Sequence, residues 1–367
     1  MCSAFPDRGS FATPLDAWLA DLCGARSPQD LSLLVRRRQI AELEATLEHA
    51  LHSSFYAERL RQSSFALEDL SRDPLVPLCL SPLPCTFPSD LTAWQRLLCV
   101  SGAAIERVVT LCTSGTTGPP KRIACTASDL EGSRAFFRFG MAGIIQSGER
   151  LCVLMPGGER PNGVADLLKQ ALAPQDIEVT YPSSSLVNAL CEGYAPNEVV
   201  DWLERFRPNV LVALPSVLAT LSRFLPLGLP GCSRLLSSGE LLSPELSACL
   251  SRQWGCEVFD HYGLTEAGYG LAVHCHAHTG YHLRALDAVV EIVDPATGST
   301  LPPGAVGEIV VTTLRREAMP LIRYRTGDLG SLCTDPCGCG SPLPRLGALA
   351  GRLNASSRPK GAFHAQD

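Results

Sequence analysis

The sequence predicts an α/β protein in which mostly parallel sheets are flanked by helices. Between residues 128 and 259, short apolar segments alternate with segments of helical period, at the spacing of strand–helix units. One apolar segment, residues 210–214, has no polar alternation, as is typical of a strand buried on both faces. From about Ala288 the pattern changes to strands separated by a Pro/Gly turn at 294–304. This change predicts a small β-rich subdomain.

The elements can be assigned in order. Residues 1–30 show no clear pattern and suggest a loosely attached arm. Residues 32–62 read as helix because Ile40, Leu43 and Leu47 recur at spacings of three and four, and a proline-rich connector at 74–88 follows. The alternating region then gives strands at 108–111, 151–155, 177–181, 210–214, 234–237 and 257–259, and helices at 128–139, 164–172, 197–206, 215–224 and 244–254. Asn197 is a candidate N-cap for the third of these helices.

Composition limits the class of protein. A chain of 367 residues with 46% hydrophobic residues and a mean hydropathy of +0.11 is globular, with room for two or three domains. The net charge of −6 leaves no basic footprint for nucleic acid. Because we find no secretory signal and no apolar run of about 18 residues, we expect no membrane association and a cytoplasmic protein. In that setting the 16 cysteines are expected to be free thiols or metal ligands.

A loop rich in hydroxyls and glycine follows the strand at 108–111. Its glycines allow positive φ and close backbone approach, its free N–H groups can bind an anion, and Lys121 at its end adds a positive charge. It is not a Walker A loop, because Pro120 stands where the second glycine is required. The composition alone would also suit a surface turn. The phosphate-loop residues are Thr113, Ser114, Gly115, Thr116, Thr117 and Gly118.

The order T-S-G-T-T-G-x-x-K resembles the phosphate loop of the adenylate-forming superfamily, which includes acyl-CoA synthetases and peptide-synthetase adenylation domains. Four further segments match that superfamily in the same order along the chain. They are Ser238-Gly239-Glu240 after a strand, Asp260-His261-Tyr262-Gly263-Leu264-Thr265-Glu266, Tyr324-Arg325-Thr326-Gly327-Asp328-Leu329, and Gly351-Arg352. The first departs from the family's G-G-E turn, since Ser238 replaces a glycine. The resemblance covers roughly residues 35–352 and is strongest to phenylacetate-CoA ligases.

The resemblance implies a role for each motif. Tyr262 would stack on adenine, Asp260 would accept from the adenine amino group, and the turn at 238–240 would contact the same base. Thr265 would bind the α-phosphate, and Glu266 would hold Mg²⁺, which prefers hard oxygen ligands. Asp328 would bind the ribose hydroxyls, and Arg352 would also reach the nucleotide. His261 and Gly263 complete the set of nucleotide-site residues.

A second set of residues suggests a metal. Two segments rich in cysteine and histidine, 274–282 and 333–339, can converge on one tetrahedral zinc. Proteins resembling phenylacetate-CoA ligases show a similar pair of segments. The ligands implied by that resemblance are Cys275, His282, Cys337 and Cys339, with Cys333, His276 and His278 as spares. Such a zinc would be structural, because four protein ligands leave no open position. Free thiols on a loop are the alternative.

The resemblance therefore implies an AMP-dependent acid–CoA ligase. ATP and an aryl or short acyl carboxylic acid would give acyl-AMP, and coenzyme A would then take the acyl group. We expect a helical region and connector at 1–100, a nucleotide-binding core at 101–287, the β-rich subdomain at 288–352 and a tail at 353–367. The acyl pocket would draw on residues 157–163, Ser237, Ser238 and His261. A homodimer is possible, and the sequence does not decide the oligomeric state.

The sequence differs from the family pattern after Arg352. The family continues past its Gly-Arg into a mobile lid domain with a catalytic lysine, whereas 367 − 352 = 15 residues follow Arg352 here. We therefore expect weak catalysis, or a lid supplied by a separate protein. The alternatives are one half of a split ligase, or a regulatory or scaffold protein that binds nucleotide or acyl-adenylate without ligating.

Overall fold

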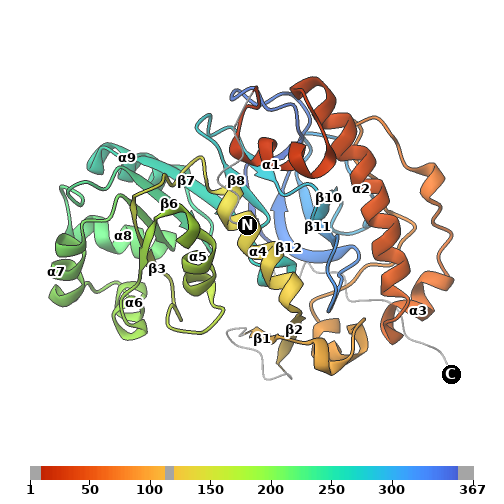
Figure 1. Ribbon diagram of the computed structural model, residues 1–367, viewed down its shortest axis with the longest axis horizontal. Coiled ribbons are helices and arrows are strands. Elements are labelled where there is room, and N and C mark those ends of the chain that lie inside the picture. The colour runs from red at the N-terminus through yellow and green to blue at the C-terminus, as the bar shows by residue number, and fades with distance from the viewer. Residues whose placement is uncertain (1–9, 112–119, 354–367) are drawn as a thin grey trace. The chain divides into compact units, whose positions relative to one another are not determined.

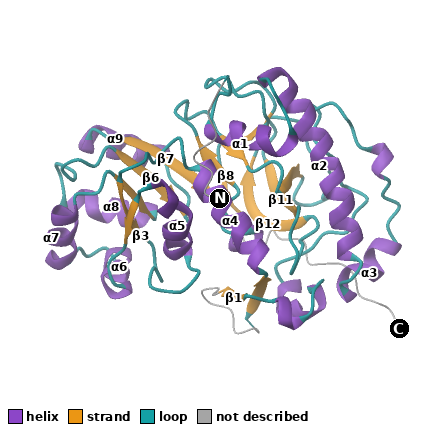
Figure 2. Cartoon of the chain, in the orientation of Figure 1, coloured by secondary structure: helices purple, strands orange, loops and turns teal. Residues whose placement is uncertain are grey.

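The computed structural model describes residues 10–111 and 120–353. The chain divides into two compact units. Unit 1 comprises residues 1–18, 133–264 and 268–282, and unit 2 comprises residues 19–132, 265–267 and 283–367. The fold class is the one expected from the sequence: strands and helices alternate through the middle of the chain, and antiparallel strands dominate its last part (Figures 1 and 2).

The strands of unit 1 lie side by side in one sheet. Their order is β4-β3-β5-β6-β7-β8-β9, and the pairs from β4 to β7 are parallel, whereas β8 is antiparallel to β7. The central strand β5 is buried along its whole length, as its unbroken apolar run predicted. The bounds are β3 (Arg150–Leu154), β4 (Glu178–Thr180), β5 (Val210–Ala213), β6 (Arg234–Ser238), β7 (Glu257–Tyr262), β8 (Ala272–His274) and β9 (Tyr281–Leu283).

Helices pack around this sheet. Apolar residues of the helices from α6 to α9 form one buried core with residues of β3, β5, β6 and β7. The helices are α4 (Ala127–Gly140), α5 (Val164–Leu172), α6 (Ser184–Cys191), α7 (Asn197–Phe206), α8 (Pro215–Phe224) and α9 (Pro244–Trp254). The predicted bounds of α5, α7, α8 and α9 are confirmed. Asn197 is not the N-cap of α7, however. Pro196 occupies that position, and Asn197 is the first helical residue.

Unit 2 holds an antiparallel sheet, one long helix and one short helix. Its four-stranded sheet has the order β10-β11-β12-β15, and two shorter antiparallel pairs are β1-β2 and β13-β14. The strands are β1 (Arg107–Leu111), β2 (Lys121–Cys125), β10 (Ala288–Val293), β11 (Gly307–Thr313), β12 (Tyr324–Gly330), β13 (Leu332–Cys333), β14 (Arg345–Leu346) and β15 (Gly351–Arg352). The helices are α2 (Pro28–Ala50) and α3 (Ser54–Arg61).

Two predictions about the N-terminal region are wrong. The described part of residues 1–30 is not a loose arm, because residues 14–23 form helix α1 (Pro14–Cys23), which buries Leu15 and Leu19. Residues 32–62 are not one helix. The chain turns after Ala50, and Ser53 caps a new helix, α3, by accepting from the backbone N–H groups of Phe55 and Tyr56. Short helices have weak periodic signals, which explains both misses.

Buried ion pairs attach the connector to the antiparallel sheet of unit 2. Arg323 on the approach to β12 bonds Glu291 of β10 (3.0 Å) and donates to the backbone oxygens of Ser81 and Leu83. Arg325 forms a second buried pair with Glu308 of β11. Since each charge has a partner and further hydrogen bonds, the pairs can be buried without leaving an orphaned charge. They fix the sheet whose last strands carry Asp328 and Arg352.

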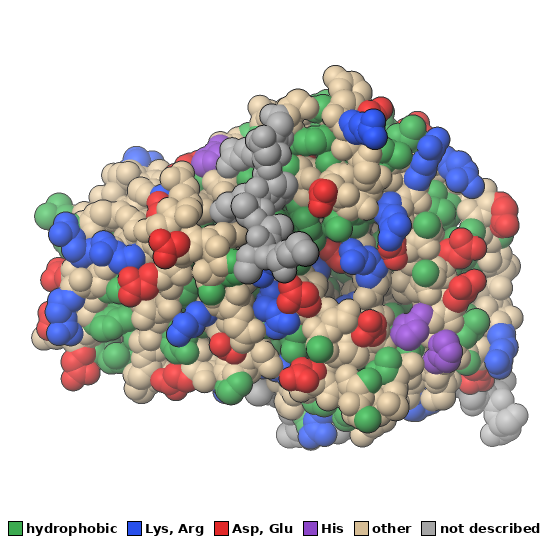
Figure 3. All heavy atoms as spheres, in the orientation of Figure 1, with side chains coloured by type: hydrophobic (Ala, Val, Ile, Leu, Met, Phe, Trp, Pro, Cys, Tyr) green, Lys and Arg blue, Asp and Glu red, His purple; other side chains and the backbone are tan. Residues whose placement is uncertain are grey.

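Within the described residues, no helix has the length and apolar character needed to span a membrane. On the face shown in Figure 3, acidic and basic side chains are interspersed.

Candidate active site

The carboxyl ends of the parallel strands of unit 1 bring together two residues predicted from separate motifs. Ser238 ends β6 and is directly opposite His261 of β7 in the register. The Ser238 hydroxyl lies 2.9 Å from His261 Nδ1. Ligands of open α/β sheets bind at this edge, because loops from neighbouring strands meet there.

The turn after β6 is built around a glycine. Gly239 has φ +85°, and a Cβ at this position would lie 2.9 Å from Leu214 Cδ2. The next residue, Glu240, accepts from the backbone N–H and the hydroxyl of Ser216, each at 3.0 Å. Ser216 lies in the first turn of α8, where a negative charge is favourable. Glu240 therefore ties the turn to this helix. Its predicted contact with the nucleotide stays a prediction.

His261 is a buried, neutral imidazole. The residue is only 6% exposed, and burial lowers the pKa of its imidazole to about 4. The ring lies near Phe136 and Phe137, with centroid distances of 6.0 and 6.4 Å. Its Nε2 has no hydrogen-bond partner among the described residues. A buried ring nitrogen without a partner costs free energy, which a polar group of a ligand would recover.

Asp260 has a hydrogen-bond partner within unit 1. It is buried on β7, and its carboxylate accepts from the Tyr281 hydroxyl at 2.6 Å. Burial raises the pKa of Asp260 to about 6, although the hydrogen bond from Tyr281 opposes the rise. The described structure thus shows an internal partner for this carboxylate. The predicted bond to an adenine amino group is not tested by it.

Tyr262 and Gly263 close the β7 segment. Tyr262 is the last residue of the strand and is buried. Gly263 has no room for a side chain, since a Cβ would lie 1.8 Å from the Tyr269 carbonyl oxygen. The close approach explains the glycine in this motif.

Unit 2 carries the residues predicted for the phosphates, metal and ribose. Lys121 is the first residue of β2 and pairs with Leu111 of β1, so the phosphate loop joins the two strands of an antiparallel ribbon. The loop residues Thr113, Ser114, Gly115, Thr116, Thr117 and Gly118 lie outside the described residues. Thr265 and Glu266 form a short 3₁₀ turn, and Glu266 accepts from the Tyr324 hydroxyl at 2.9 Å. Nothing in the sequence singled out the hydroxyl of Tyr324 for this contact.

Asp328 and Arg352 come from different motifs and meet on neighbouring strands. They are directly opposite in the pairing of β12 with β15, and Arg352 Nε lies 2.6 Å from Asp328 Oδ1. The Arg352 side chain is 65% exposed, so the pair lies at the surface of the sheet. A carboxylate beside an arginine is a suitable site for sugar hydroxyls together with a phosphate.

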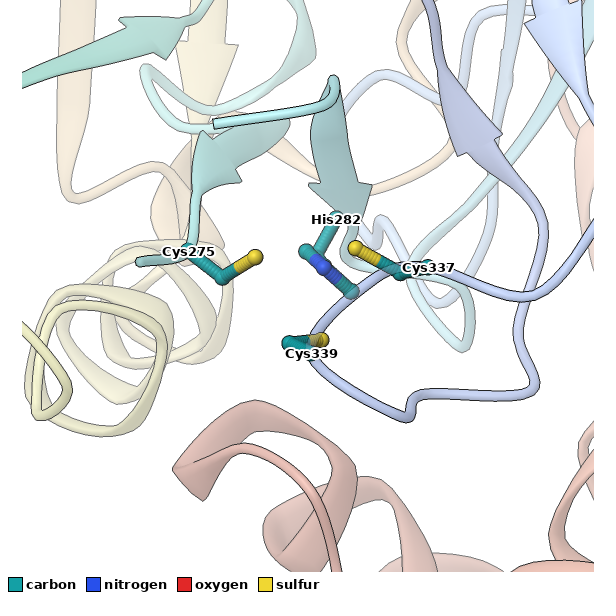
Figure 4. Close-up of side chains that lie close together, drawn as sticks. All are labelled: Cys275, His282, Cys337 and Cys339. Atoms are coloured by element: carbon teal, nitrogen blue, oxygen red, sulfur yellow. The ribbon is translucent and has the colours of Figure 1, made fainter. Parts of the chain in front are cut away.

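The predicted metal ligands are also close together. One ligand atom from each of Cys275, His282, Cys337 and Cys339 lies within 4.8 Å of the others (Figure 4). His282 and Cys337 are buried, and the backbone N–H of Ala277 donates to the Cys275 sulfur at 3.4 Å. Three sulfurs and one imidazole nitrogen are the donor set of structural zinc, so the residues fit that ion.

Comparison with known proteins shows the family of the chain. The model of the family described as "AMP-binding enzyme" matches residues 101–314, and the chain belongs to that family.

Several curated relatives are phenylacetate-coenzyme A ligases. One from Thermus thermophilus is 30% identical over 266 residues, which cover 66% of this chain and 54% of the relative. One from Pseudomonas putida is 28% identical over 332 residues, which cover 87% of this chain and 70% of the relative. The chain thus spans only about half of the length of the Thermus enzyme.

A solved structure of 2-hydroxyisobutyryl-CoA ligase, in complex with an acyl-adenylate and CoA, has the same fold. The two structures superpose with a TM-score of 0.73 at 22% sequence identity. The match covers 87% of this chain and 68% of the solved ligase chain. The likeness confirms the α/β fold expected from the sequence.

Proposed function

We propose that this chain activates a carboxylic acid with ATP and passes the acyl group to coenzyme A. The observation that carries the proposal is the pairing of Asp328 with Arg352 at 2.6 Å, in a chain of the AMP-binding enzyme family. Relatives named phenylacetate-coenzyme A ligases support an acid–CoA ligase. The substrate would be an aryl or short acyl carboxylic acid.

In the first step a carboxylate oxygen of the acid attacks the α-phosphorus of ATP. The bond from that phosphorus to the bridging oxygen breaks, and pyrophosphate leaves. Lys121 and the phosphate loop would hold the β- and γ-phosphates, Thr265 the α-phosphate, and Asp328 with Arg352 the ribose side. Glu266 would hold Mg²⁺, which neutralises phosphate charge when bound. Tyr324 would orient Glu266 by the hydrogen bond it donates to Oε1.

In the second step the CoA thiolate attacks the acyl carbonyl carbon, and AMP leaves. The protein contributes mainly by positioning, because a bound acid and nucleotide react without the entropy loss of an encounter in solution. We assign the acyl group to the carboxyl edge of the unit 1 sheet. Ser238 and His261 lie at the carboxyl ends of β6 and β7, and the loop at 157–163 follows β3. His261 would offer its Nε2 to a polar atom of the acid.

We also propose that Cys275, His282, Cys337 and Cys339 hold one structural zinc ion. The support is the donor set and the spread of at most 4.8 Å among the ligand atoms. Zinc would take these cysteines as thiolates, and the Ala277 N–H would stabilise the Cys275 sulfur.

The test of the ligase proposal is ATP–pyrophosphate exchange over a panel of aryl and short acyl acids. We expect at least one acid to stimulate exchange, and we expect the same acid to give an acyl-CoA thioester when CoA is added. Asp328→Ala should strongly reduce the stimulation when ATP is below saturation. Exchange that no acid of the panel stimulates, although the protein binds ATP, would contradict activation of this class of substrate.

A further inference from the structure

A pocket in unit 2 lies apart from the residues assigned above. Its walls come from helix α2, the connector at 74–88, strand β10, and strand β13 with the loop that follows it. Most of the lining side chains are apolar, and they include Val35, Leu78, Val290 and Leu343. The pocket is partly open to solvent and has a cavity volume of about 40 Å³, whereas one water needs about 10–15 Å³. It therefore has room for a group of about three atoms.

One charged side chain, that of Arg36, lines this apolar pocket. Arg36 belongs to the buried face of α2, together with Leu31 and Ile40, and is 4% exposed. Its Nη1 and Nη2 donate to the backbone oxygens of Ser71 and Pro74, at 3.1 and 3.3 Å. Its Nε has no hydrogen-bond partner among the described residues. The two carbonyl oxygens accept from the guanidinium, but they carry no full negative charge that would balance it.

The other buried arginines of the described structure each form an ion pair with a carboxylate. They are Arg284, Arg316, Arg323, Arg325 and Arg345, and their partners are Asp287, Asp129, Glu291, Glu308 and Asp335. Within the part of the chain that the structure describes, Arg36 has no such partner. Burial lowers the pKa of Arg36, and the charge of the exposed Asp73 opposes this shift without forming an ion pair. A buried charge without a counter-charge is unfavourable, and an anion from solution would supply one.

We propose that this pocket binds the carboxylate group of a small organic acid beside Arg36. A guanidinium is planar, and its N–H groups match the two oxygens of a carboxylate. The volume of about 40 Å³ suits the three atoms of that group. A phosphate has two more non-hydrogen atoms and needs more space, so the size of the pocket favours a carboxylate. The site uses none of the residues assigned to ATP, and the proposal is independent of the ligase function.

The walls of the pocket favour an acid with a short hydrocarbon chain. Leu78 in the connector and Leu343 in the loop before β14 are both buried and both line the pocket. Contact with such side chains removes apolar carbon atoms of a ligand from water. Because the pocket is partly open, carbon atoms beyond the first can extend toward solvent. Butyrate combines the required charge with a short apolar chain and is therefore a suitable probe.

The experiment is a titration of the full chain with butyrate, followed by NMR of the leucine methyl groups. The signals of Leu78 and Leu343, assigned with Leu78→Ile and Leu343→Ile, should shift and saturate. We expect a dissociation constant in the millimolar range, because butyrate has few atoms. The signals of Leu211, in the core of unit 1, should not shift. 1-Butanol has the same chain without the charge and should bind at least about tenfold more weakly.

Arg36→Gln should weaken butyrate binding by at least about tenfold. The matched control is Arg37→Gln, which removes the same charge from the next residue of α2, at an exposed position, and should bind butyrate like the wild type. Circular dichroism checks the fold of both variants. If Arg36→Gln does not fold, the comparison of butyrate with 1-butanol in the wild type decides.

Three results would overturn the proposal. They are the absence of a saturable shift at Leu78 and Leu343, equal binding of butyrate and 1-butanol, and unchanged butyrate affinity in a folded Arg36→Gln variant.

Discussion

At the scale of single residues, the surface pair of Asp328 and Arg352 is the clearest link between the structure and nucleotide binding. The two side chains are close without a ligand, because strand pairing places them opposite each other. An arginine that is already positioned orients the carboxylate for hydroxyl donors.

Replacing Asp328 by Ala should weaken ATP binding by about 10- to 100-fold, since hydrogen bonds to a charged group contribute about 1.5–3 kcal/mol. Isothermal calorimetry with ATP and Mg²⁺ measures the change. Asp69→Ala is the control, because Asp69 is an exposed aspartate in the same unit. Equal affinities for the two variants would remove Asp328 from the nucleotide site.

His261 gives a pH prediction. Burial lowers its pKa to about 4 in the folded chain, against about 6.5 when it is exposed. Between those values the unfolded chain binds more protons, so the free energy of unfolding falls as the pH falls from about 6.5 toward 4. This group alone should remove about 2 kcal/mol between pH 7 and pH 5.

Urea unfolding at pH 7 and pH 5 measures this pH dependence of the free energy of unfolding for the wild type and for His261→Gln. The variant should lose about 2 kcal/mol less over that interval than the wild type. His52→Gln, at an exposed position, should follow the wild type. Identical pH dependence in His261→Gln and the wild type would show that the imidazole is not buried as described.

At the scale of secondary-structure elements, the start of α3 shows how one side chain redirects the chain. Ser53 is fully buried, accepts from two backbone N–H groups of the helix and donates to the carbonyl of Arg96 at 2.8 Å. Its neighbour Ser54 is exposed and makes one longer contact, 3.4 Å, to the same carbonyl. Ser54 is therefore a suitable control position for a substitution of Ser53.

Ser53→Ala should lower the free energy of unfolding by about 1–2 kcal/mol, as expected when an N-cap is lost together with the hydrogen bond to the Arg96 carbonyl. Ser54→Ala should change it by less than about 0.5 kcal/mol. Urea denaturation of both variants measures the difference. If the two losses were equal, Ser53 would not be the cap.

At the scale of the whole molecule, four ligands from distant parts of the sequence are expected to share one zinc. The wild type should contain one zinc per chain by metal analysis, and Cys337→Ser should lose it. Removing the metal with a chelator should lower the melting temperature, because binding to the folded state alone stabilises that state. Cys249→Ser is the control, since Cys249 is an exposed cysteine outside the cluster. A zinc content well below one in the wild type would contradict the site.

Much of this architecture was readable from the sequence. The alternating strands and helices of unit 1 were predicted because their periodicities are local properties of the chain, and α8 and α9 begin with prolines at positions where helices tolerate them. The N-terminal helix α1 and the break before α3 were missed, because short helices depend on contacts with distant residues. The set of metal ligands Cys275, His282, Cys337 and Cys339 was predicted from a resemblance rather than from spacing alone.

The sequence by itself determined the motifs, because phosphate, ribose and metal chemistry restrict the residue types at each position. Only the tertiary structure decided which of these residues meet. Strand register placed Ser238 beside His261 and Asp328 beside Arg352. Folding also gave Asp260 and Glu240 internal partners, Tyr281 and Ser216, that no local pattern reveals. Such contacts join residues far apart in the sequence, and their energies depend on burial, which is a property of the folded chain.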